Sequence, residues 1–582
     1  MADGKRLYNC ELVRSGCGPS TATPNLQIGG FGNIKDMSSG KLLARPDLKA
    51  PCDVGTIVSN GIIASPPSLC RCPMENWGYR ALATATLDIS SDKIPNASSR
   101  LTTGSKEPPI ALDITASDWP TYRANTARTG ATKVNVTPTM PKERWRWSPA
   151  RPVEFEPSTL KNLNRPRTTT NPQFSATPPV AAAGKIWIGT ADGVVRCLDA
   201  ASGKPIWSFA TAACLLASPT VADGRIFFGS GDGWIYCLDA TSGRELWRFR
   251  AAPLQRKILW YGHLIDTWPV VTGVVAHEGV AYAAAGYHII NGVYVYALDA
   301  ASGRVLWENH DSAQLDAISG GNGAVGTMTV GHGKLWLAGG LDWPVSFDLK
   351  TGQLDLNPTR AIAGWDKVTL RGSEIAIFAD RFILYGGRRL VSGYDERVMP
   401  GMGVGFACVD LKDSNTKTSK VVVLPKSTLP PVWDSDLIVG ARDRNIQLSG
   451  WNTSQLTTYL DETISQAQDS MRSGKRAQLP GTGKETVANP VHLQAWEVPG
   501  YDEFSAAALT ANALVAVQSV PAKGKNSLPT WKLAAFDRKN GVPLWAVPLP
   551  CEPVFNGICV DRDGHILVVL RDGSMLCYQS NP

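Results

Sequence analysis

The chain has 582 residues, of which 43% are hydrophobic and 19% are charged, which is enough to bury at least one large core. Its net charge of +7 is small for this length and the basic residues are scattered, so no nucleic-acid-binding surface is expected. No apolar run approaches the roughly 20 residues of a membrane-spanning helix. The 55 glycines and 40 prolines favour a loop-rich, all-β chain.

The N-terminal region, residues 1–117, is rich in Gly, Pro and Ser and shows little hydrophobic periodicity, so we expect an irregular, Cys-rich appendage. Its start lacks an apolar stretch and a cleavage site, so no export signal is expected in the chain. A region with so little core usually depends on disulfides. A metal site is the weaker alternative, because Cys70-Arg71-Cys72 is not a C-x-x-C pair and no His precedes His263. The candidate disulfide cysteines are Cys10, Cys17, Cys52, Cys70 and Cys72.

Two segments precede the first repeat of the remaining domain, residues 118–582. Asp118–Thr132 (DWPTYRANTARTGAT) resembles a stretch that often leads into PQQ-repeat propellers, which implies that it runs across one face of that domain. Arg123 or Arg128 could bind an anionic ligand there, although a structural role is the favoured interpretation. Lys142–Pro149 (KERWRWSP) has the pattern of an outer strand that carries a Trp.

One sequence pattern then recurs after 40 residues, in Asp192–Phe209 (DGVVRCLDAASGKPIWSF) and Asp232–Phe249 (DGWIYCLDATSGRELWRF). Such a period, with four short strands per unit, is typical of a β-propeller. More degenerate copies lie at Tyr294–Glu308, Val345–Leu354, Phe406–Asp413, Leu533–Ala546 and Asp572–Ser580.

Each repeat places an Asp, a turn Gly and a Trp at fixed positions. The Gly suits a tight turn with positive φ, and the large Trp can fill the gap between adjacent sheets. The repeat positions are Asp199, Gly203, Trp207, Asp239, Gly243, Trp247, Asp299, Gly303, Trp307, Gly541 and Trp545. Cys197, Cys237, Cys408 and Cys577 share one strand position, where other repeats have Ala, which predicts small, buried thiols.

The spacing predicts eight units, and therefore an all-β, eight-bladed propeller. The last unit has only three strand candidates before the chain ends, so Lys142–Pro149 is expected to close the ring as its fourth strand. An insertion around 451–486 contains Gln455–Arg472, where apolar residues recur at helical spacing. Thr453 or Ser454 could cap this helix. The helix could be a lid or partner surface, or it could cover an exposed sheet edge.

The loops before the inner strands are expected to share one face of the ring, which we call the loop face. They bring aromatic and ionisable groups together, as a ligand site does, most densely in Trp260–Trp268 (WYGHLIDTW). No catalytic residue can be assigned. The candidate ligand-binding residues are Trp260, His263, Asp266, Trp268, Asn322, Arg388, Trp433, Asp434, Glu503 and Asn556.

The run Leu198–Trp207 (LDAASGKPIW), with its copies ending at Trp247 and Trp307, resembles the PQQ-repeat, or quinoprotein alcohol dehydrogenase-like, superfamily. Its members are largely periplasmic, so the resemblance implies an extracytoplasmic location. Its dehydrogenases hold PQQ between a Trp ring and, in the alcohol-oxidising members, an adjacent-cysteine disulfide, beside Ca²⁺ and an Asp base. Trp268 or Trp433 could be that ring and Asp266 or Asp434 that base.

No two cysteines are adjacent in this chain, which argues against the alcohol dehydrogenase type. The resemblance therefore implies a non-quinone binding or scaffold module for an extracytoplasmic protein or glycan partner, with no cofactor firmly implied. A PQQ- and Ca-dependent oxidoreductase is the first alternative. A cofactor-free enzyme acting on polysaccharide is the second.

Overall fold

The structure is a computed structural model, and most of its described elements are β-strands. It describes residues 20–29, 34–44, 55–65, 80–83, 95–150, 176–260, 263–287, 292–313, 322–339, 342–355, 372–387, 405–410, 420–425, 427, 429–442, 447–472, 490–498, 504–520 and 530–579. Within these residues, no helix has the length and apolar character needed to cross a bilayer.

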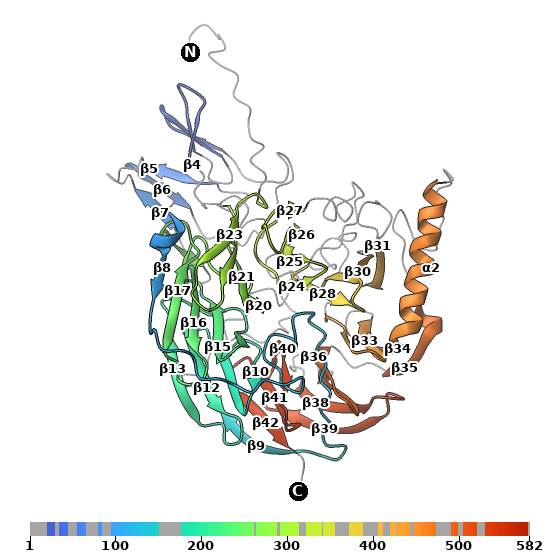
Figure 1. Ribbon diagram of the computed structural model, residues 1–582. Helices are drawn as coiled ribbons and strands as arrows, with labels where there is room; N and C mark the ends of the chain where they lie inside the picture. Colours follow the sequence, from blue (N-terminus) through green and yellow to red (C-terminus); the bar gives the residue numbers. More distant parts are fainter. Residues whose placement is uncertain are drawn as a thin grey trace.

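The repeats fold into antiparallel sheets of consecutive strands (Figure 1). The first contains β10 (Val180–Ala182), β11 (Lys185–Gly189), β12 (Val194–Asp199) and β13 (Pro205–Ala210). The second contains β14 (Thr220–Ala222), β15 (Arg225–Gly229), β16 (Trp234–Asp239) and β17 (Glu245–Arg250). The third contains β20 (Val274–His277), β21 (Val280–Ala285), β22 (Tyr294–Asp299) and β23 (Val305–Asn309). The fourth contains β24 (Met328–Gly331), β25 (Lys334–Gly339), β26 (Asp342–Asp348) and β27 (Leu354–Asp355).

The later sheets follow the same plan. They are β28 (Glu374–Phe378), β29 (Phe382–Gly386), β30 (Gly405–Asp410) and β31 (Lys420–Pro425); β32 (Val432–Trp433), β33 (Leu437–Arg442), β34 (Gln447–Asn452) and β35 (Gln494–Val498); and β36 (Phe504–Leu509), β37 (Ala513–Val520), β38 (Thr530–Asp537) and β39 (Pro543–Leu549). The last sheet contains β40 (Pro553–Val560), β41 (Ile566–Leu570) and β42 (Met575–Gln579).

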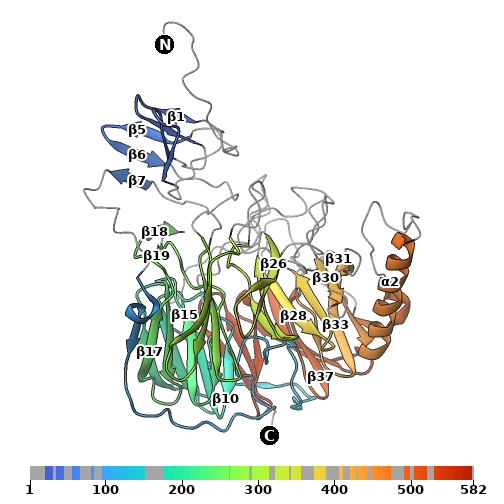
Figure 2. The ribbon, with the colours of Figure 1, turned by 45° about the horizontal axis from the view of Figure 1, so that its top comes forward.

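The last sheet is completed by β9 (Lys142–Trp147), which pairs antiparallel with β42 and places Trp145 opposite Cys577. This is the pairing expected for Lys142–Pro149. Figures 1 and 2 show the sheets in chain order around a common centre, as in a β-propeller. The inner strands read as continuous apolar runs because adjacent sheets cover both of their faces. The outer strand β13, by contrast, is largely exposed.

The tryptophans of the repeats join adjacent sheets, as predicted. Trp207 donates its indole N–H to the Ala240 carbonyl at 3.1 Å. Gly243 has a φ of +73°, and a Cβ there would lie 2.6 Å from the Trp207 ring, so only glycine lets the ring pack on this turn. Four other tryptophans donate to a backbone carbonyl and pack their ring on a turn glycine in the same way. The carbonyl and the glycine are those of Ala200 and Gly203 for Trp145, Ala300 and Gly303 for Trp247, Leu349 and Gly352 for Trp307, and Arg538 and Gly541 for Trp496. Trp545 donates to Thr137.

Other repeat positions are also structural. Asp199, Asp239 and Asp299 each accept a hydrogen bond from the backbone N–H three residues later, which holds the turn. Cys197, Cys237 and Cys577 are fully buried, as predicted, and burial raises the pKa of Cys197 to about 12. The side chain of Cys408 lies outside the described residues.

The N-terminal region contains short strands that Figures 1 and 2 show outside the ring. They are β1 (Thr21–Ala22), β2 (Leu26–Ile28), β3 (Ile34–Asp36), β4 (Leu42–Ala44), β5 (Ile57–Ser59), β6 (Ile62–Ser65) and β7 (Arg80–Ala83). The five candidate disulfide cysteines lie outside the described residues, so these disulfides stay predictions.

The N-terminal region reaches the ring before residue 118. The 3-10 helix η2 (Ala97–Arg100) leads into β8 (Leu101–Thr103), which adds a fifth strand to the outer edge of β17. Arg100 is 2% exposed and pairs with Glu308 at 2.7 Å. The boundary at residue 117 stays a prediction, although residues 97–103 already contact the sheets.

The segment Asp118–Val134, which we call the crossing segment, runs along the innermost strands and is drawn in blue in Figure 1. Trp119 exchanges two backbone hydrogen bonds with Ala181 of β10. Further along, backbone hydrogen bonds join Pro120 to Val221, Ala127 to Ile377, Thr129 to Trp433, Gly130 to Leu509 and Val134 to Ala511. The prediction that this segment crosses one face of the ring is confirmed.

The predicted helix is present as α2 (Thr453–Arg472). Its cap differs from the prediction: Asn452 accepts the Gln455 N–H at 3.1 Å, while the Thr453 hydroxyl donates to the Asp434 carbonyl. Leu456 and Leu460 are buried against the strands of the fifth and sixth sheets, which favours the interpretation that α2 covers a sheet edge. The 3-10 helix η5 (Pro490–Leu493) precedes β35.

Candidate functional site

The crossing segment closes one end of a central cavity of about 150 Å³. Thr121, Tyr122 and Arg128 of that segment line it. The opposite wall comes from residues just before the innermost strands, in Ala176–Pro178, Leu215–Ser218, Val271–Gly273 and Val325–Thr327, together with Glu374, Tyr287 and Phe555. The cavity therefore lies inside the ring, between the crossing segment and the loop face.

The polar groups of this cavity form a buried cluster. The Tyr122 hydroxyl donates to the Glu374 carboxylate at 3.1 Å and accepts from the Asn556 amide at 2.8 Å. Burial, and the nearby Glu374 charge, raise the pKa of Tyr122 well above its ordinary value. Asn556, a sequence candidate, has a positive φ of 54° and is only 7% exposed.

Sequence reasoning missed Tyr122 and Glu374. The only available signal for Tyr122 was its position beside Arg123 in Asp118–Thr132. No signal marked Glu374, because it opens a strand that otherwise reads as ordinary core.

The segment rich in aromatic residues that was expected to be a loop is partly a hairpin. β18 (Lys257–Trp260) pairs with β19 (His263–Asp266), and Trp260 lies opposite His263. Two short apolar runs separated by Tyr261-Gly262 are a hairpin signal that could have revealed it. Figure 2 shows both strands beyond the ends of the ring strands, on the side of the N-terminal strands.

Within this hairpin region, Asp266 is 4% exposed and accepts the Trp268 N–H at 3.0 Å. Burial raises the pKa of Asp266 to about 6. Burial also lowers the pKa of His263, which is half-buried.

Trp268 lies in a sheet core, and its role in ligand binding stays a prediction. Its side chain is 6% exposed and packs in the core between the second and third sheets, with its ring 6.3 Å from that of Tyr294.

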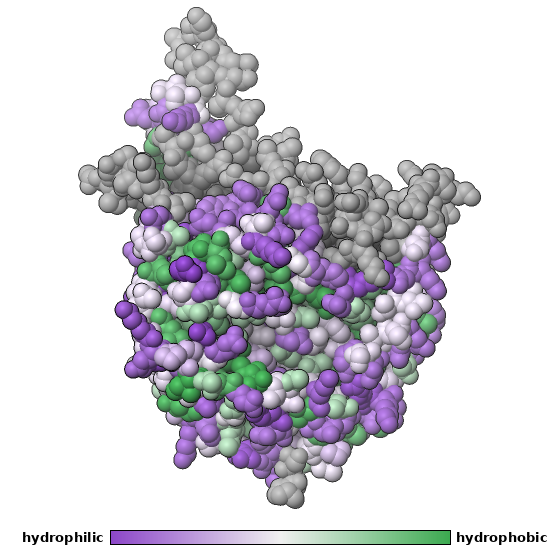
Figure 3. All heavy atoms as spheres, in the orientation of Figure 1, coloured by the Kyte–Doolittle hydropathy of each residue, from purple (hydrophilic) through white to green (hydrophobic). Residues whose placement is uncertain are grey.

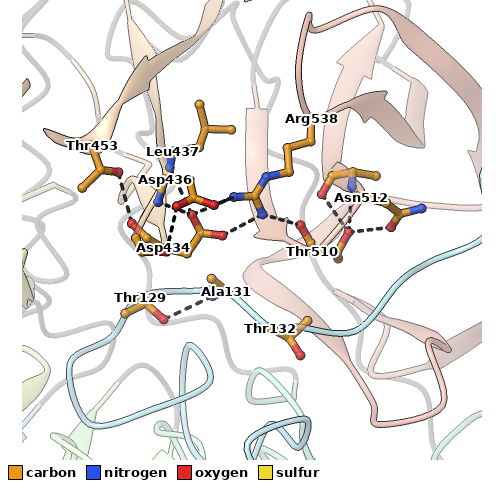
Figure 4. A network of polar contacts seen from close by, with 12 residues as sticks. Thr129, Ala131, Thr132, Asp434, Asp436, Leu437, Thr453, Thr510, Asn512 and Arg538 are labelled. Atoms are coloured by element: carbon orange, nitrogen blue, oxygen red, sulfur yellow. Dashed lines mark hydrogen bonds and ion pairs between the residues drawn. The ribbon is translucent and has the colours of Figure 1, made fainter. Parts of the chain in front are cut away.

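Trp433 is likewise a core residue, 4% exposed and edge-on to Phe378 at 5.8 Å. The neighbouring Asp434 belongs to a polar network between the sixth and seventh sheets (Figure 4). Its two carboxylate oxygens accept from Arg538 at 2.6 and 2.8 Å. Burial alone would raise the pKa of Asp434, but the hydrogen bonds from Arg538 and two backbone N–H groups hold it below its ordinary value.

The remaining candidates do not converge on one point. Asn322 is fully buried, and its amide lies 3.4 Å from the Leu337 carbonyl. Arg388 and Glu503 lie outside the described residues, as does the side chain of Trp260. Of the ten sequence candidates, only Asn556 contacts a residue that lines the central cavity through a hydrogen bond that the structure describes.

The described residues do not fit PQQ with Ca²⁺. The two tryptophans proposed to support the quinone ring are packed in sheet cores, and Asp434 is paired with an arginine. Along the described cavity wall, Glu374 is the one carboxylate, and it already accepts from Tyr122. A Ca²⁺ site normally uses several oxygen ligands, which this wall does not bring together.

One group of described residues has the composition of a metal site. Asp561, Asp563 and His565 lie close together in the turn between β40 and β41. The Asp561 carboxylate accepts the N–H groups of Asp563 and His565, so the turn itself explains the cluster.

The sheets, the crossing segment and the Trp–Gly contacts define a β-propeller built from repeated four-stranded units. Residues 136–388 match the PQQ_2 family model, described as outer membrane protein assembly factor BamB. This match covers less than half of the chain and is consistent with the resemblance of its repeats to the PQQ-repeat, quinoprotein alcohol dehydrogenase-like superfamily.

Several solved structures are similar to this chain. Quinohemoprotein alcohol dehydrogenase from Comamonas testosteroni is 13% identical, with a TM-score of 0.47 over 80% of this chain and 81% of that one. A europium-containing methanol dehydrogenase is 12% identical, with a TM-score of 0.45 over 78% and 90%. BamB from Moraxella catarrhalis is 13% identical, with a TM-score of 0.30 over 69% and 80%. These TM-scores lie below 0.5, and nothing about function follows from them. No curated protein matches the chain.

Proposed function

We propose that the chain is a binding or scaffold module that uses no quinone and binds a protein partner outside the cytoplasm. The observation that carries this proposal is the use of Trp268, Trp433 and Asp434 in sheet packing and an ion pair. These residues are three of the four candidates for a quinone site, and the fourth, Asp266, is buried and accepts the Trp268 N–H. The family description, an outer membrane assembly factor, supports both a protein partner and an extracytoplasmic location.

The proposed architecture is an eight-bladed ring over residues 118–582, closed by β9 and β42, with residues 1–117 as the appendage and a helical insertion around 451–486. It is supported by the succession of four-stranded sheets, from β10–β13 to the sheet that β9 completes. No observation favours the glycan partner or the polysaccharide enzyme.

The β18–β19 hairpin is the proposed partner contact. Leu264 on β19 is 54% exposed, although its neighbours Ile265 and Asp266 are buried. We propose that this exposed leucine is the apolar contact for the partner. Figure 3 shows one face of the molecule, on which hydrophilic residues surround several separate hydrophobic patches.

The test compares two matched variants of the full chain. Leu264→Asp removes the apolar contact on the hairpin, whereas Leu306→Asp makes the same change on outer strand β23, where the leucine is 52% exposed. Each protein is used to capture partners from an envelope extract, and the partner captured by the wild type is then purified and titrated. We expect Leu264→Asp to weaken binding at least tenfold and Leu306→Asp to leave it unchanged. Equal binding by both variants would contradict the proposed contact.

A second measurement tests the absence of a quinone. The purified chain is incubated with PQQ and Ca²⁺, and bound quinone absorbance and dye-linked alcohol oxidation are measured. Stoichiometric quinone binding with dye reduction would overturn the non-quinone proposal in favour of an oxidoreductase.

A further inference from the structure

Two arginines of the crossing segment are buried without a carboxylate partner. Arg123 is 6% exposed and Arg128 is 4% exposed. Arg128 donates to the carbonyls of Met328 at 2.9 Å and Tyr122 at 2.8 Å, and to the Thr121 hydroxyl at 2.9 Å. Arg123 donates to the Pro431 carbonyl. All of these acceptors are neutral, and within the described residues neither guanidinium takes part in an ion pair.

Among the described residues, the charges near the cavity do not balance. Glu374, which is 7% exposed, is the carboxylate on the described cavity wall, and it accepts from Tyr122. Its charge acts on both Arg128, which lines the cavity, and Arg123, which does not, so this described cluster has one more guanidinium than carboxylate. Burial lowers the pKa of Arg128 to about 10, as expected for a cation removed from water. Buried charges are usually paired, so this excess calls for an anion.

The size and lining of the cavity limit which anions can bind there. Its volume of about 150 Å³ is close to that of an engineered cavity known to accept benzene. Arg128 lies at the end formed by the crossing segment, and most of the remaining wall is apolar, with Leu215, Leu216, Val271, Val274, Val325 and Val554 among its residues. An apolar wall suits a hydrocarbon body and disfavours a small, fully hydrated ion such as phosphate.

We propose that the central cavity binds a small organic monocarboxylate. Its carboxylate pairs with Arg128, and its apolar body lies against the valine and leucine side chains that precede the innermost strands. The single negative charge of such a ligand matches the excess charge. Leu264, the proposed partner contact, does not line this cavity, so ligand binding can be tested independently of the protein partner.

Binding is measured by isothermal titration calorimetry on the full chain, with benzoate as the probe. Benzyl alcohol has a similar shape without the charge, and inorganic phosphate has the charge without the apolar body. We expect benzoate to bind and both comparison compounds to bind at least tenfold more weakly. No benzoate binding, or equal binding of either comparison compound, would overturn the proposal.

Two variants assign the binding to this cavity. Arg128→Gln removes the cation and should weaken benzoate binding at least tenfold. Ala217→Leu leaves Arg128 in place and fills part of the cavity, which Ala217 lines, so it should also abolish binding. Ala495→Leu, at an exposed position on outer strand β35, is the control and should bind like the wild type. If Arg128→Gln fails to fold, Ala217→Leu still decides, because unchanged benzoate binding in that variant would place the ligand elsewhere.

Discussion

Gly203 and Gly184 form a matched pair of glycines in the first sheet. Both have a positive φ, +69° and +72°. A Cβ at Gly203 would lie 2.6 Å from the ring of Trp145, whereas a Cβ at Gly184 would have no atom within 4 Å. Substituting each by Ala therefore introduces the same backbone strain, and only Gly203→Ala adds a clash with the closing strand β9.

The two variants are therefore expected to lower the free energy of unfolding by different amounts. The left-handed conformation costs an alanine about 1–2 kcal/mol, which is the whole effect expected for Gly184→Ala. Gly203→Ala adds overpacking of about 1–3 kcal/mol. It also displaces the Trp145 indole from the Ala200 carbonyl, which it reaches at 3.0 Å, and that hydrogen bond contributes about 1 kcal/mol. We expect Gly203→Ala to lower the free energy of unfolding by about 2–4 kcal/mol more than Gly184→Ala does.

Urea unfolding followed by intrinsic tryptophan fluorescence measures this difference, provided that the free energy of unfolding falls with urea concentration at the same slope in both variants. In a Trp145→Ala background the clash is absent, so Gly203→Ala should cost no more than Gly184→Ala. Equal destabilisation by the two glycine variants in the wild-type background would refute the contribution of the Trp–Gly contact to ring closure.

Three further outcomes are expected. Trp247→Ala should lower the free energy of unfolding in urea by about 3–5 kcal/mol, because its ring is buried between sheets, and a change typical of a surface residue would contradict this. Cys197, Cys237 and Cys577 should resist alkylation until the protein is denatured, and rapid labelling of the native protein would show that they are accessible. Asp266 has a folded pKa of about 6, above its unfolded value, so its ionised form destabilises the fold above pH 6. Asp266→Asn should therefore raise the melting temperature at pH 7.5 and not at pH 4, and an equal gain at both pH values would rule out titration of Asp266 as the cause.

The repeat positions could be predicted from the sequence because each is defined by a local pattern that recurs. Trp207 and Gly243 each stand at a fixed place in a repeat, so the contact between neighbouring sheets follows once the repeats are stacked in a ring. The buried thiols of Cys197 and Cys237 follow in the same way from exchange with Ala. The helix predicted at Gln455–Arg472 is present as Thr453–Arg472, because its apolar periodicity is also local.

The candidate site could not be predicted as well, because it lies in segments that do not repeat. Trp268 and Trp433 were placed on the loop face, yet both lie in sheet cores, and a single Trp outside a repeat gives no indication of which way its ring points. Their orientation depends on packing against Tyr294 and Phe378, which lie elsewhere in the chain.

The amino-acid sequence by itself therefore determined the repeated sheets, the Trp–Gly contacts between them and the closing strand. Only the tertiary structure decided which groups meet at the centre of the ring. Tyr122 contacts Glu374, 252 positions away, and Asn556, 434 positions away. Such contacts arise because the ring brings distant segments together at its axis, and no local pattern of residues records that geometry.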